Sequence, residues 1–493
     1  MSILAAIAVI ASCSVLIDAC KVSQLHVTLG DMFEVDSASD HAFTLSAVFE
    51  GCDEFPRYFI DCQSDKMMVV EDIIAKAIDI DIGGTRYARR SIHAKIAADK
   101  VNCKWQIRYN GLLVAGPYDL PARVLDDSKP LTIAIVADMD LTIYSSATVG
   151  RLMQLNVDDI DIVMHVGDFA YEIEDDGGNN GDAFFEQMSK KTRMIPYIVT
   201  PGNHENFAGG ELFNYRFRMP NTGNDPVSEG QNHYYEFFVK GVYFISLNFD
   251  YILVLKPDKF KESLTWIEEK LKAVQNNKNI KWKVFFSHRP IICNDLQFTL
   301  DCSFNMFRLK AFDDLFIKYN ITVVLNAHLH IYSRLRPYHD WQPRSIDSVG
   351  RGSYMQLISG HAGTKHYFPD NSTAYMYEYP FVEKVDLSGP TYMTWQVTRK
   401  RLQGQLRLSK DDSILDEFSF VSPASRRYPA WLFPVIITVA VVFFLAVVWM
   451  MVYFLKHMKK EDERLQQELE TRLMPESRMQ SVGVCNLENE LAS

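Results

Sequence analysis

Six apolar runs of strand length, spread along the middle of this 493-residue chain, constrain its fold more than any other feature. They cover residues 131–137, 160–166, 195–200, 242–247, 282–286 and 321–325. Stretches with helical spacing lie between several of them, at residues 182–193, 261–274 and 306–319. Continuously apolar strands are typical of sheets buried on both faces. Their alternation with helices predicts an α/β layer domain.

Five short segments place side chains that can bind metals just after apolar runs. They are Ala137-Asp138-Met139-Asp140, Gly167-Asp168-Phe169-Ala170-Tyr171, Gly202-Asn203-His204-Glu205, Ser287-His288-Arg289-Pro290 and Ala327-His328-Leu329-His330. In folds of this class, ligands gather beyond the carboxyl ends of the strands, so we expect the segments to meet. Together they supply carboxylates, a phenol, an amide oxygen and imidazoles, which is the donor set of a two-metal hydrolytic centre.

Each segment taken alone has a structural interpretation. An aspartate at a strand end, such as Asp138, is usually a turn residue, and a tyrosine such as Tyr171 more often belongs to the core. We interpret His165 as a core residue, and we assign no ligand role to His361 or His366. The order of all five segments at strand ends favours the metal site over five unrelated structural roles.

The five segments resemble the motifs of the purple acid phosphatases, a branch of the calcineurin-like metallophosphoesterases. The resemblance covers residues 131–337 and includes Asn214-Tyr215-Arg216 and Met219-Pro220, whereas the amino-terminal part matches only loosely. It implies a layered β-sheet sandwich flanked by helices. It also implies hydrolysis of phosphate monoesters at acidic pH.

The resemblance implies a ligand set residue by residue. The first metal would be held by Asp138, Asp168, Tyr171 and His330. The second metal would be held by Asp168, Asn203, His288 and His328, with Asp168 bridging the two. Phenolate and carboxylate donors favour a ferric ion at the first site, and the second set suits divalent iron, zinc or manganese. Charge transfer from the tyrosinate to iron would make the protein purple.

Three neighbouring residues receive roles outside the ligand set. His204 would protonate the leaving oxygen or stabilise the charge on phosphate, which makes it the catalytic candidate. Glu205 is placed to orient His204. Arg289 is either a phosphate contact or one partner of a structural ion pair.

Asp140 departs from the family pattern, which has glycine at this position. Its carboxylate either coordinates the first metal and weakens the Lewis acidity of that ion, or points to solvent. Two alternatives to a phosphomonoesterase stay open, and only the second depends on Asp140. One is a phosphodiesterase or nucleotide hydrolase on the same scaffold, and the other is a metal-binding receptor that has lost turnover.

Both ends of the chain carry apolar segments of different length. We interpret residues 1–20 as a signal peptide, residues 430–455 as a transmembrane helix and residues 456–493 as a cytosolic tail. This predicts a single-pass type I membrane protein with its larger part in the secretory or endolysosomal lumen or outside the cell. The net charge of −11 and the lack of a basic stripe argue against a nucleic-acid partner.

The exported part divides into a β-rich module, residues 21–125, and a metallophosphoesterase domain, residues 126–425. Within the module, residues 67–80 are either strand or helix. Cys293 and Cys302 are a plausible disulfide pair, whereas the pairing of Cys20, Cys52, Cys62 and Cys103 stays open. Asn320 and Asn371 begin sequons for glycosylation, and the protein is therefore expected to be a glycoprotein.

Overall fold

The computed structural model describes residues 20–33, 41–62, 67–100, 102–220, 222, 231–293, 299–339, 342–364, 382–423 and 432–472. The chain divides into two compact units, Met1–Ser425 and Arg426–Ser493. The predicted signal peptide before Cys20, the sequon at Asn371, His366 and the end of the tail lie outside the described residues.

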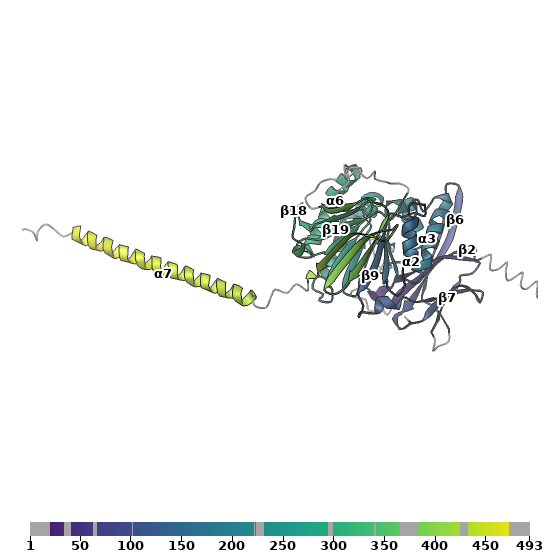
Figure 1. The fold of residues 1–493 in the computed structure, drawn as a ribbon, viewed down its shortest axis with the longest axis horizontal. Coiled ribbons are helices and arrows are strands. Elements are labelled where there is room, and N and C mark those ends of the chain that lie inside the picture. The colour runs from purple at the N-terminus through teal and green to yellow at the C-terminus, as the bar shows by residue number, and fades with distance from the viewer. Residues whose placement is uncertain are drawn as a thin grey trace, which may run out of the picture. The chain divides into compact units, whose positions relative to one another are not determined.

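Two sheets form the centre of the first unit (Figure 1). The first has the order β11 (Tyr197–Thr200), β10 (Ile162–Val166), β9 (Leu131–Val136), β21 (Thr391–Val397), β22 (Arg401–Leu408) and β23 (Ile414–Val421). The second has the order β12 (Tyr234–Val239), β13 (Val242–Leu247), β14 (Trp282–Phe286), β15 (Val323–Asn326), β19 (Met355–Ser359), β16 (Tyr332–Leu335) and β20 (Val382–Asp386). Strands β9 to β11 are parallel, as are β13, β14, β15 and β19. Their carboxyl ends therefore gather at one edge of each sheet.

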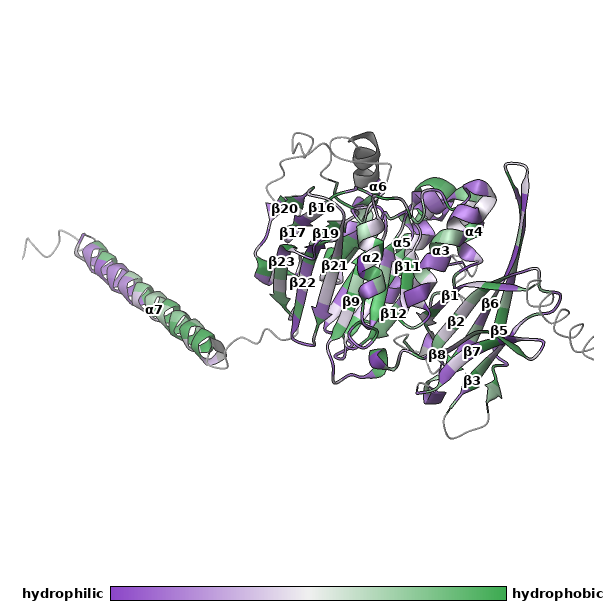
Figure 2. Ribbon diagram, turned by 45° about the vertical axis from the view of Figure 1, so that its right-hand side comes forward, coloured by the Kyte–Doolittle hydropathy of each residue, from purple (hydrophilic) through white to green (hydrophobic). Residues whose placement is uncertain are grey.

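The alternation of side chains along β14 explains how the layers pack. Val284 and Phe286 belong to the core shared with β9 and β10, whereas Phe285 points into a second core. That second core contains residues of α5 (Phe260–Ala273) and α6 (Thr299–Lys318). Helices α2 (Ser146–Gln154) and α3 (Asn179–Thr192) lie beside the β9 sheet (Figures 1 and 2). The predicted α/β sandwich flanked by helices is confirmed.

The amino-terminal region is built from two four-stranded sheets. One has the order β1 (Lys21–Leu29), β2 (His41–Glu50), β6 (Thr85–Ala97) and β5 (Ile73–Ile82), and the other β4 (Met68–Val69), β3 (Arg57–Asp61), β7 (Lys104–Tyr109) and β8 (Leu112–Asp119). The helical alternative for residues 67–80 is wrong, because these residues contribute β4 and most of β5. One residue of β5, Lys76, donates from Nζ to the carbonyl oxygens of Asn214 and Phe217, at 2.7 and 3.1 Å.

Disulfides close both amino-terminal sheets. Cys20 pairs with Cys52, and Cys62 pairs with Cys103, which settles the pairing that the sequence left open. Cys293 is also disulfide-bonded, while the side chain of Cys302 lies outside the described residues. Disulfides of this kind form in oxidising compartments.

Arg216 joins the amino-terminal sheets to the central sandwich. Its guanidinium is almost fully buried and donates to Gln24 Oε1 at 2.8 Å, Tyr87 OH at 2.7 Å and Asp182 Oδ1 at 2.7 Å. Gln24 and Tyr87 come from β1 and β6, whereas Asp182 comes from α3. A buried cation requires such partners, since an unpaired buried charge is strongly destabilising.

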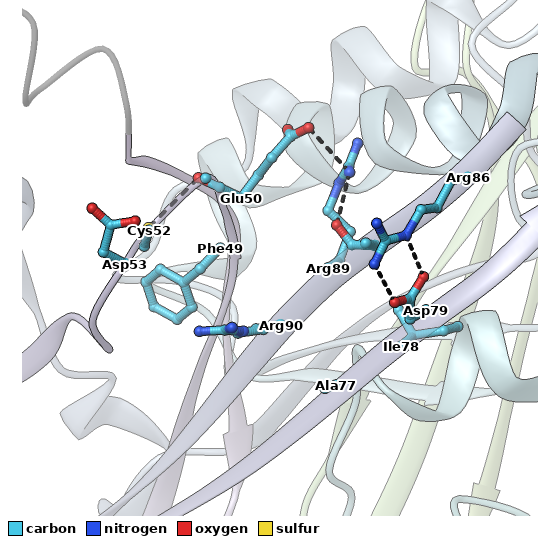
Figure 3. A pocket seen from close by; sticks show the side chains of 12 residues that line it. Phe49, Glu50, Cys52, Asp53, Ala77, Ile78, Asp79, Arg86, Arg89 and Arg90 are labelled. Carbon is cyan, nitrogen blue, oxygen red and sulfur yellow. Dashed lines mark hydrogen bonds and ion pairs between the residues drawn. The ribbon is translucent and has the colours of Figure 1, made fainter.

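A shallow pocket on the amino-terminal module carries a contrasting, exposed ion pair (Figure 3). Arg86 donates to the carboxylate of Asp79 at 2.8 and 2.6 Å, and most of both side chains is exposed. Exposed pairs contribute little to stability because water solvates both partners when the pair is broken.

We predict that Arg216→Leu lowers the free energy of unfolding by about 3 kcal/mol, because Gln24 Oε1 and the partly buried Asp182 both lose their contact with this buried cation. Arg86→Leu is the matched control, and we expect no measurable change from it. Chemical denaturation of the first unit, followed by tryptophan fluorescence, measures both values. Equal effects of the two substitutions would contradict the assigned role of Arg216.

A buried histidine in β1 makes the stability of this region depend on pH. Burial lowers the pKa of His26 from 6.5 to about 4, although its Nδ1 contacts the carbonyl oxygen of Gln24. Below pH 6.5 the unfolded chain therefore binds a proton at this residue that the folded chain does not bind until about pH 4. The loss of stability caused by His26 is absent above pH 6.5 and grows as the pH falls.

We expect the free energy of unfolding to fall between pH 6.5 and 4, with about 3 kcal/mol of the loss due to His26. His26→Phe removes the titrating ring while keeping the packing against Phe217, and it should flatten the slope in this window. Denaturation series at several pH values measure the slope. An unchanged slope would assign the pH dependence to other residues.

The second unit contains one long helix, α7 (Leu432–Arg472). Residues 434–472 include a segment apolar enough to cross a membrane, with a mean hydropathy of 3.0 over its best window. Figure 2 shows the apolar amino-terminal half and the hydrophilic carboxyl-terminal half of this helix. The helix is consistent with single-pass anchoring.

Candidate metal centre

Several candidate ligands lie at the carboxyl ends of parallel strands in unusual backbone conformations. Asp138 follows β9 with φ 54°, Asp168 follows β10 with φ 54°, and His328 follows β15 with φ 71°. Residues other than glycine rarely adopt positive φ, and such conformations cluster at functional sites. The backbone there turns sharply and aims the side chains into the space between the two sheets' edges.

Asp168 lies at the centre of the site. Its side chain is almost fully buried, and its Oδ2 lies 3.1 Å from His288 Nε2 and 3.8 Å from His204 Nε2. Its Oδ1 accepts a hydrogen bond of 3.1 Å from the backbone N–H of His204. Asp168 therefore touches residues that follow strands of both sheets.

The first cluster of possible ligand atoms joins Asp138, Asp168 and His330. His330 Nε2 lies 3.2 Å from Asp138 Oδ1. The phenol of Tyr171 adjoins both, at 2.9 Å from His330 Nε2 and 3.0 Å from Asp138 Oδ1. All four side chains are buried.

The second cluster joins Asp168, His288 and His328. The amide oxygen of Asn203 adjoins it, 3.2 Å from His288 Nε2. His288 Nδ1 lies 2.9 Å from the carbonyl oxygen of Val166, which fixes the ring and directs Nε2 toward Asp168. Within each cluster the ligand atoms lie within 4.8 Å of one another, and Asp168 belongs to both.

The residues present fit two metal ions. Two buried carboxylates and three buried imidazoles in contact are costly without a compensating charge, and they form a suitable donor set for transition metals. Three glycines make room for this set. A Cβ atom on Gly202 would lie 2.1 Å from Asp168 Oδ1, one on Gly167 2.5 Å from His288 Nδ1, and one on Gly360 2.9 Å from Asp138 Oδ2.

The electrostatics of the site follow from burial and from the two carboxylates. Burial, together with Asp138 and Asp168, raises the pKa of Tyr171 well above 10.0. Burial lowers the pKa of His288, but Asp168 and Asp138 outweigh this effect and raise it to about 10. Asp168 and Glu172 likewise raise the pKa of His204 to about 9 against the effect of burial. Metal binding at such sites displaces protons from the ligands.

Glu172, which sequence reasoning missed, is the carboxylate that contacts His204. It accepts a hydrogen bond from His204 Nδ1, and the two side chains keep partial exposure. The sequence signal that could have indicated this contact was the position of Glu172 directly after Tyr171. The expectation that Glu205 orients His204 is wrong, because its carboxylate accepts from the backbone N–H groups of Asp168, Phe169 and Gly202 at 2.7–2.9 Å.

Arg289 forms the ion pair that was one of its two expected roles. Its Nε donates to Asp250 Oδ1 at 2.6 Å, and its Nη1 lies 3.0 Å from His328 Nε2. Asp250, which follows β13, was not identified from the sequence. Arg289 therefore lies against the second cluster.

Asp140 is buried, so the expectation that it points to solvent is wrong. Its Oδ1 accepts hydrogen bonds from the backbone N–H of Thr142 at 2.8 Å, from the Thr142 hydroxyl at 2.7 Å and from the Ser145 hydroxyl at 3.0 Å. It belongs to neither cluster among the described residues. Its carboxylate therefore organises the loop that follows β9.

The structure thus brings together all seven residues of the predicted ligand set, and their binding of metals stays a prediction. His165 is fully buried against aromatic rings, as expected of a core residue. His361 is also buried, and its pKa is lowered to about 4, chiefly by burial and then by His330. It therefore lies near the first cluster without joining it.

The segment that contains all seven candidate ligands also matches known proteins. Residues 131–332 match the calcineurin-like phosphoesterase family. Human acid phosphatase type 7 is 27% identical over 218 residues, which are 41% of this chain and 48% of that protein. Purple acid phosphatase 21 of Arabidopsis thaliana is 25% identical over 349 residues, covering 68% and 72% of the two chains. The chain thus spans about half the length of the animal relatives it matches.

Among solved structures, purple acid phosphatase PPD1 from yellow lupin seeds has the same fold. The TM-score is 0.60 at 15% identity, and the match covers 83% of this chain and 77% of that one. The coverage of this chain exceeds the 131–332 segment, so the likeness extends beyond the segment that carries the candidate ligands.

We predict that Asp168→Asn loses both metals, because this carboxylate is shared, whereas His328→Ala loses only the second. Elemental analysis of the purified proteins should give about two metal ions per chain for the wild type and about one for His328→Ala. His204→Asn is the control, and we expect it to keep both metal ions. Equal metal content in all four proteins would remove this ligand assignment.

Proposed function

We propose that this chain, whose residues 131–332 form a calcineurin-like phosphoesterase domain related to the purple acid phosphatases, hydrolyses phosphate monoesters at a dinuclear metal centre. The observation that carries the proposal is the pair of ligand clusters that share Asp168. Two metal ions in this set would supply Lewis-acid stabilisation of the phosphate and an activated water.

The chain's own residues define the remaining steps. Glu172 holds Nδ1 of His204, so Nε2 is the atom directed toward the centre, where it lies 3.8 Å from Asp168 Oδ2. His204 keeps 22% of its side-chain surface exposed, unlike the buried aspartates and histidines of the ligand set, and can meet a substrate. In the proposed reaction its imidazolium donates a proton from Nε2 to the leaving alkoxide oxygen.

The donor atoms support a specific pair of metals. The phenol of Tyr171 and the two aspartates favour a ferric ion at the first site. Imidazoles from His288 and His328, with the amide of Asn203, suit divalent iron, zinc or manganese at the second. An acidic optimum is proposed from the likeness to acid phosphatases, together with the ability of a ferric ion to ionise bound water at low pH.

The proposed topology places the first unit outside the cytosol and the tail within it. Two disulfides in that unit support an oxidising compartment, and α7 supplies the membrane anchor. Asn320 is exposed, as a glycan acceptor must be, although Thr322 of the same sequon is buried. The proposed partners are the membrane and a phosphate ester, and the acidic net charge does not favour nucleic acid.

The alternative of a receptor without turnover rested on Asp140 acting as an additional ligand of the first metal. The hydrogen bonds from Thr142 and Ser145 engage one oxygen of Asp140 in the loop instead, which favours the enzyme. A phosphodiesterase would use the same donor set. Parallel assays with an aryl phosphate and its diester therefore separate the two enzymatic possibilities.

The test of the proposal is phosphate release from an aryl phosphate by the purified full-length protein across a range of pH. We expect turnover in the acid range together with a broad visible absorption band from the Tyr171–iron pair. Two bound metals without turnover on any phosphoester would reject the enzymatic proposal.

His204→Asn should lower kcat by about 100-fold or more while metal content stays unchanged, because it removes the proton donor but no ligand. Steady-state kinetics and elemental analysis on the same preparation measure the two quantities. Turnover close to that of the wild type would remove His204 from the mechanism.

A further inference from the structure

A short apolar loop stands directly beside the proposed centre. Three residues after Asp138, the chain reaches the surface and exposes three apolar side chains within four residues. The exposed fractions are 40% for Leu141, 81% for Ile143 and 43% for Tyr144. Single exposed apolar residues are ordinary, but a cluster beside a candidate site requires an explanation.

The loop is held in place by polar bonds rather than by burial of these side chains. Asp140 accepts from the N–H and hydroxyl of Thr142 and from the hydroxyl of Ser145. The Ser145 hydroxyl also lies 2.7 Å from the carbonyl oxygen of Asp140. An aspartate that bonds the backbone two residues ahead fixes a tight turn. The apolar side chains are therefore presented outward by a rigid turn.

The base of the loop is fastened to the centre itself. The N–H of Met139 donates to the carbonyl oxygen of Asp168 at 3.2 Å, and the N–H of Ala170 donates to Met139 at 3.0 Å. The N–H of Asp140 donates to Gly363 at 3.2 Å. Tyr171, whose phenol touches Asp138, has its ring 4.4 Å from the ring of His204. Tyr171 thus lies between Asp138, from which the loop begins, and the proposed proton donor His204.

The edge of the β9 sheet opposite the loop carries another exposed apolar residue. Strand β9 ends at the site, β21 and β22 alternate in direction, and β23 is antiparallel to β22. Val421, at the end of β23, pairs with Arg401 near the edge where β9 begins. The chain therefore leaves the first unit at the sheet edge opposite the loop.

We propose that Leu141, Ile143 and Tyr144 form an apolar rim that binds the leaving group of the substrate. The preferred substrates are then phosphate monoesters of apolar alcohols, with alkyl or aryl leaving groups, rather than of polyols. This inference rests on the proposed function, and it assigns to Asp140 the role of holding the rim.

The experiment compares hexyl phosphate with glycerol phosphate on the full-length protein in nanodiscs. The wild type should show a higher kcat/KM for hexyl phosphate than for glycerol phosphate. Ile143→Ser and Leu141→Ser should each lower the ratio of these two kcat/KM values by about fivefold, because each removes part of the apolar contact with the hexyl group. Val421→Ser, which alters a 38% exposed apolar residue at the opposite edge, is the matched control and should keep the ratio.

The rim can also be tested without catalysis, by calorimetric measurement of the binding of two phosphonates. Hexylphosphonate should bind more tightly than methylphosphonate, and Ile143→Ser should reduce this preference. Absence of turnover on both esters would reject the proposed function. The ratio of the affinities for the two phosphonates would still test whether the rim binds an apolar group. Unchanged ratios in both loop variants would overturn the rim. So would an unchanged phosphonate preference in Ile143→Ser.

Discussion

The carboxylate of Asp168 is the feature on which the rest of the site depends. It is buried and belongs to both ligand clusters, so residues that follow β10 of one sheet must meet residues that follow β14 and β15 of the other. That meeting requires the two sheets to pack face to face with their parallel strands ending at the same edge. Glu205 completes the arrangement by binding the backbone N–H of Asp168 and Phe169 at 2.9 Å.

The amino-terminal module is structurally continuous with this site. Phe169, which lies between Asp168 and Tyr171, packs against Phe213 and Phe217 with ring centroids 5.8 and 6.4 Å apart. Those phenylalanines flank Arg216, whose guanidinium is bonded by residues of β1 and β6. A displacement of the amino-terminal module would therefore be transmitted to the backbone of Asp168, since tightly packed interiors transmit strain.

Asp140 illustrates how one replacement can acquire a role without altering the ligand set. A glycine at this position would leave Thr142 and Ser145 without the carboxylate that both now contact. These hydrogen bonds satisfy the buried carboxylate. The same bonds fix an exposed apolar turn shortly after Asp138, so a departure from the family pattern coincides with a surface feature of this chain.

The sequence by itself determined the strands and the local position of the ligands. Strands β13 and β14 occupy the predicted residues, because an apolar run of strand length between polar segments is typical of a buried strand. Only the tertiary structure decided which distant groups meet: Glu172 rather than Glu205 at His204, Asp250 at Arg289, and the pairing of Cys20 with Cys52. Lys76 of β5 also contacts the carbonyl oxygens of residues 214 and 217, which no local pattern indicates. These outcomes depend on contacts across more than 30 residues, and a local pattern carries no information about its partner until the sheets are packed.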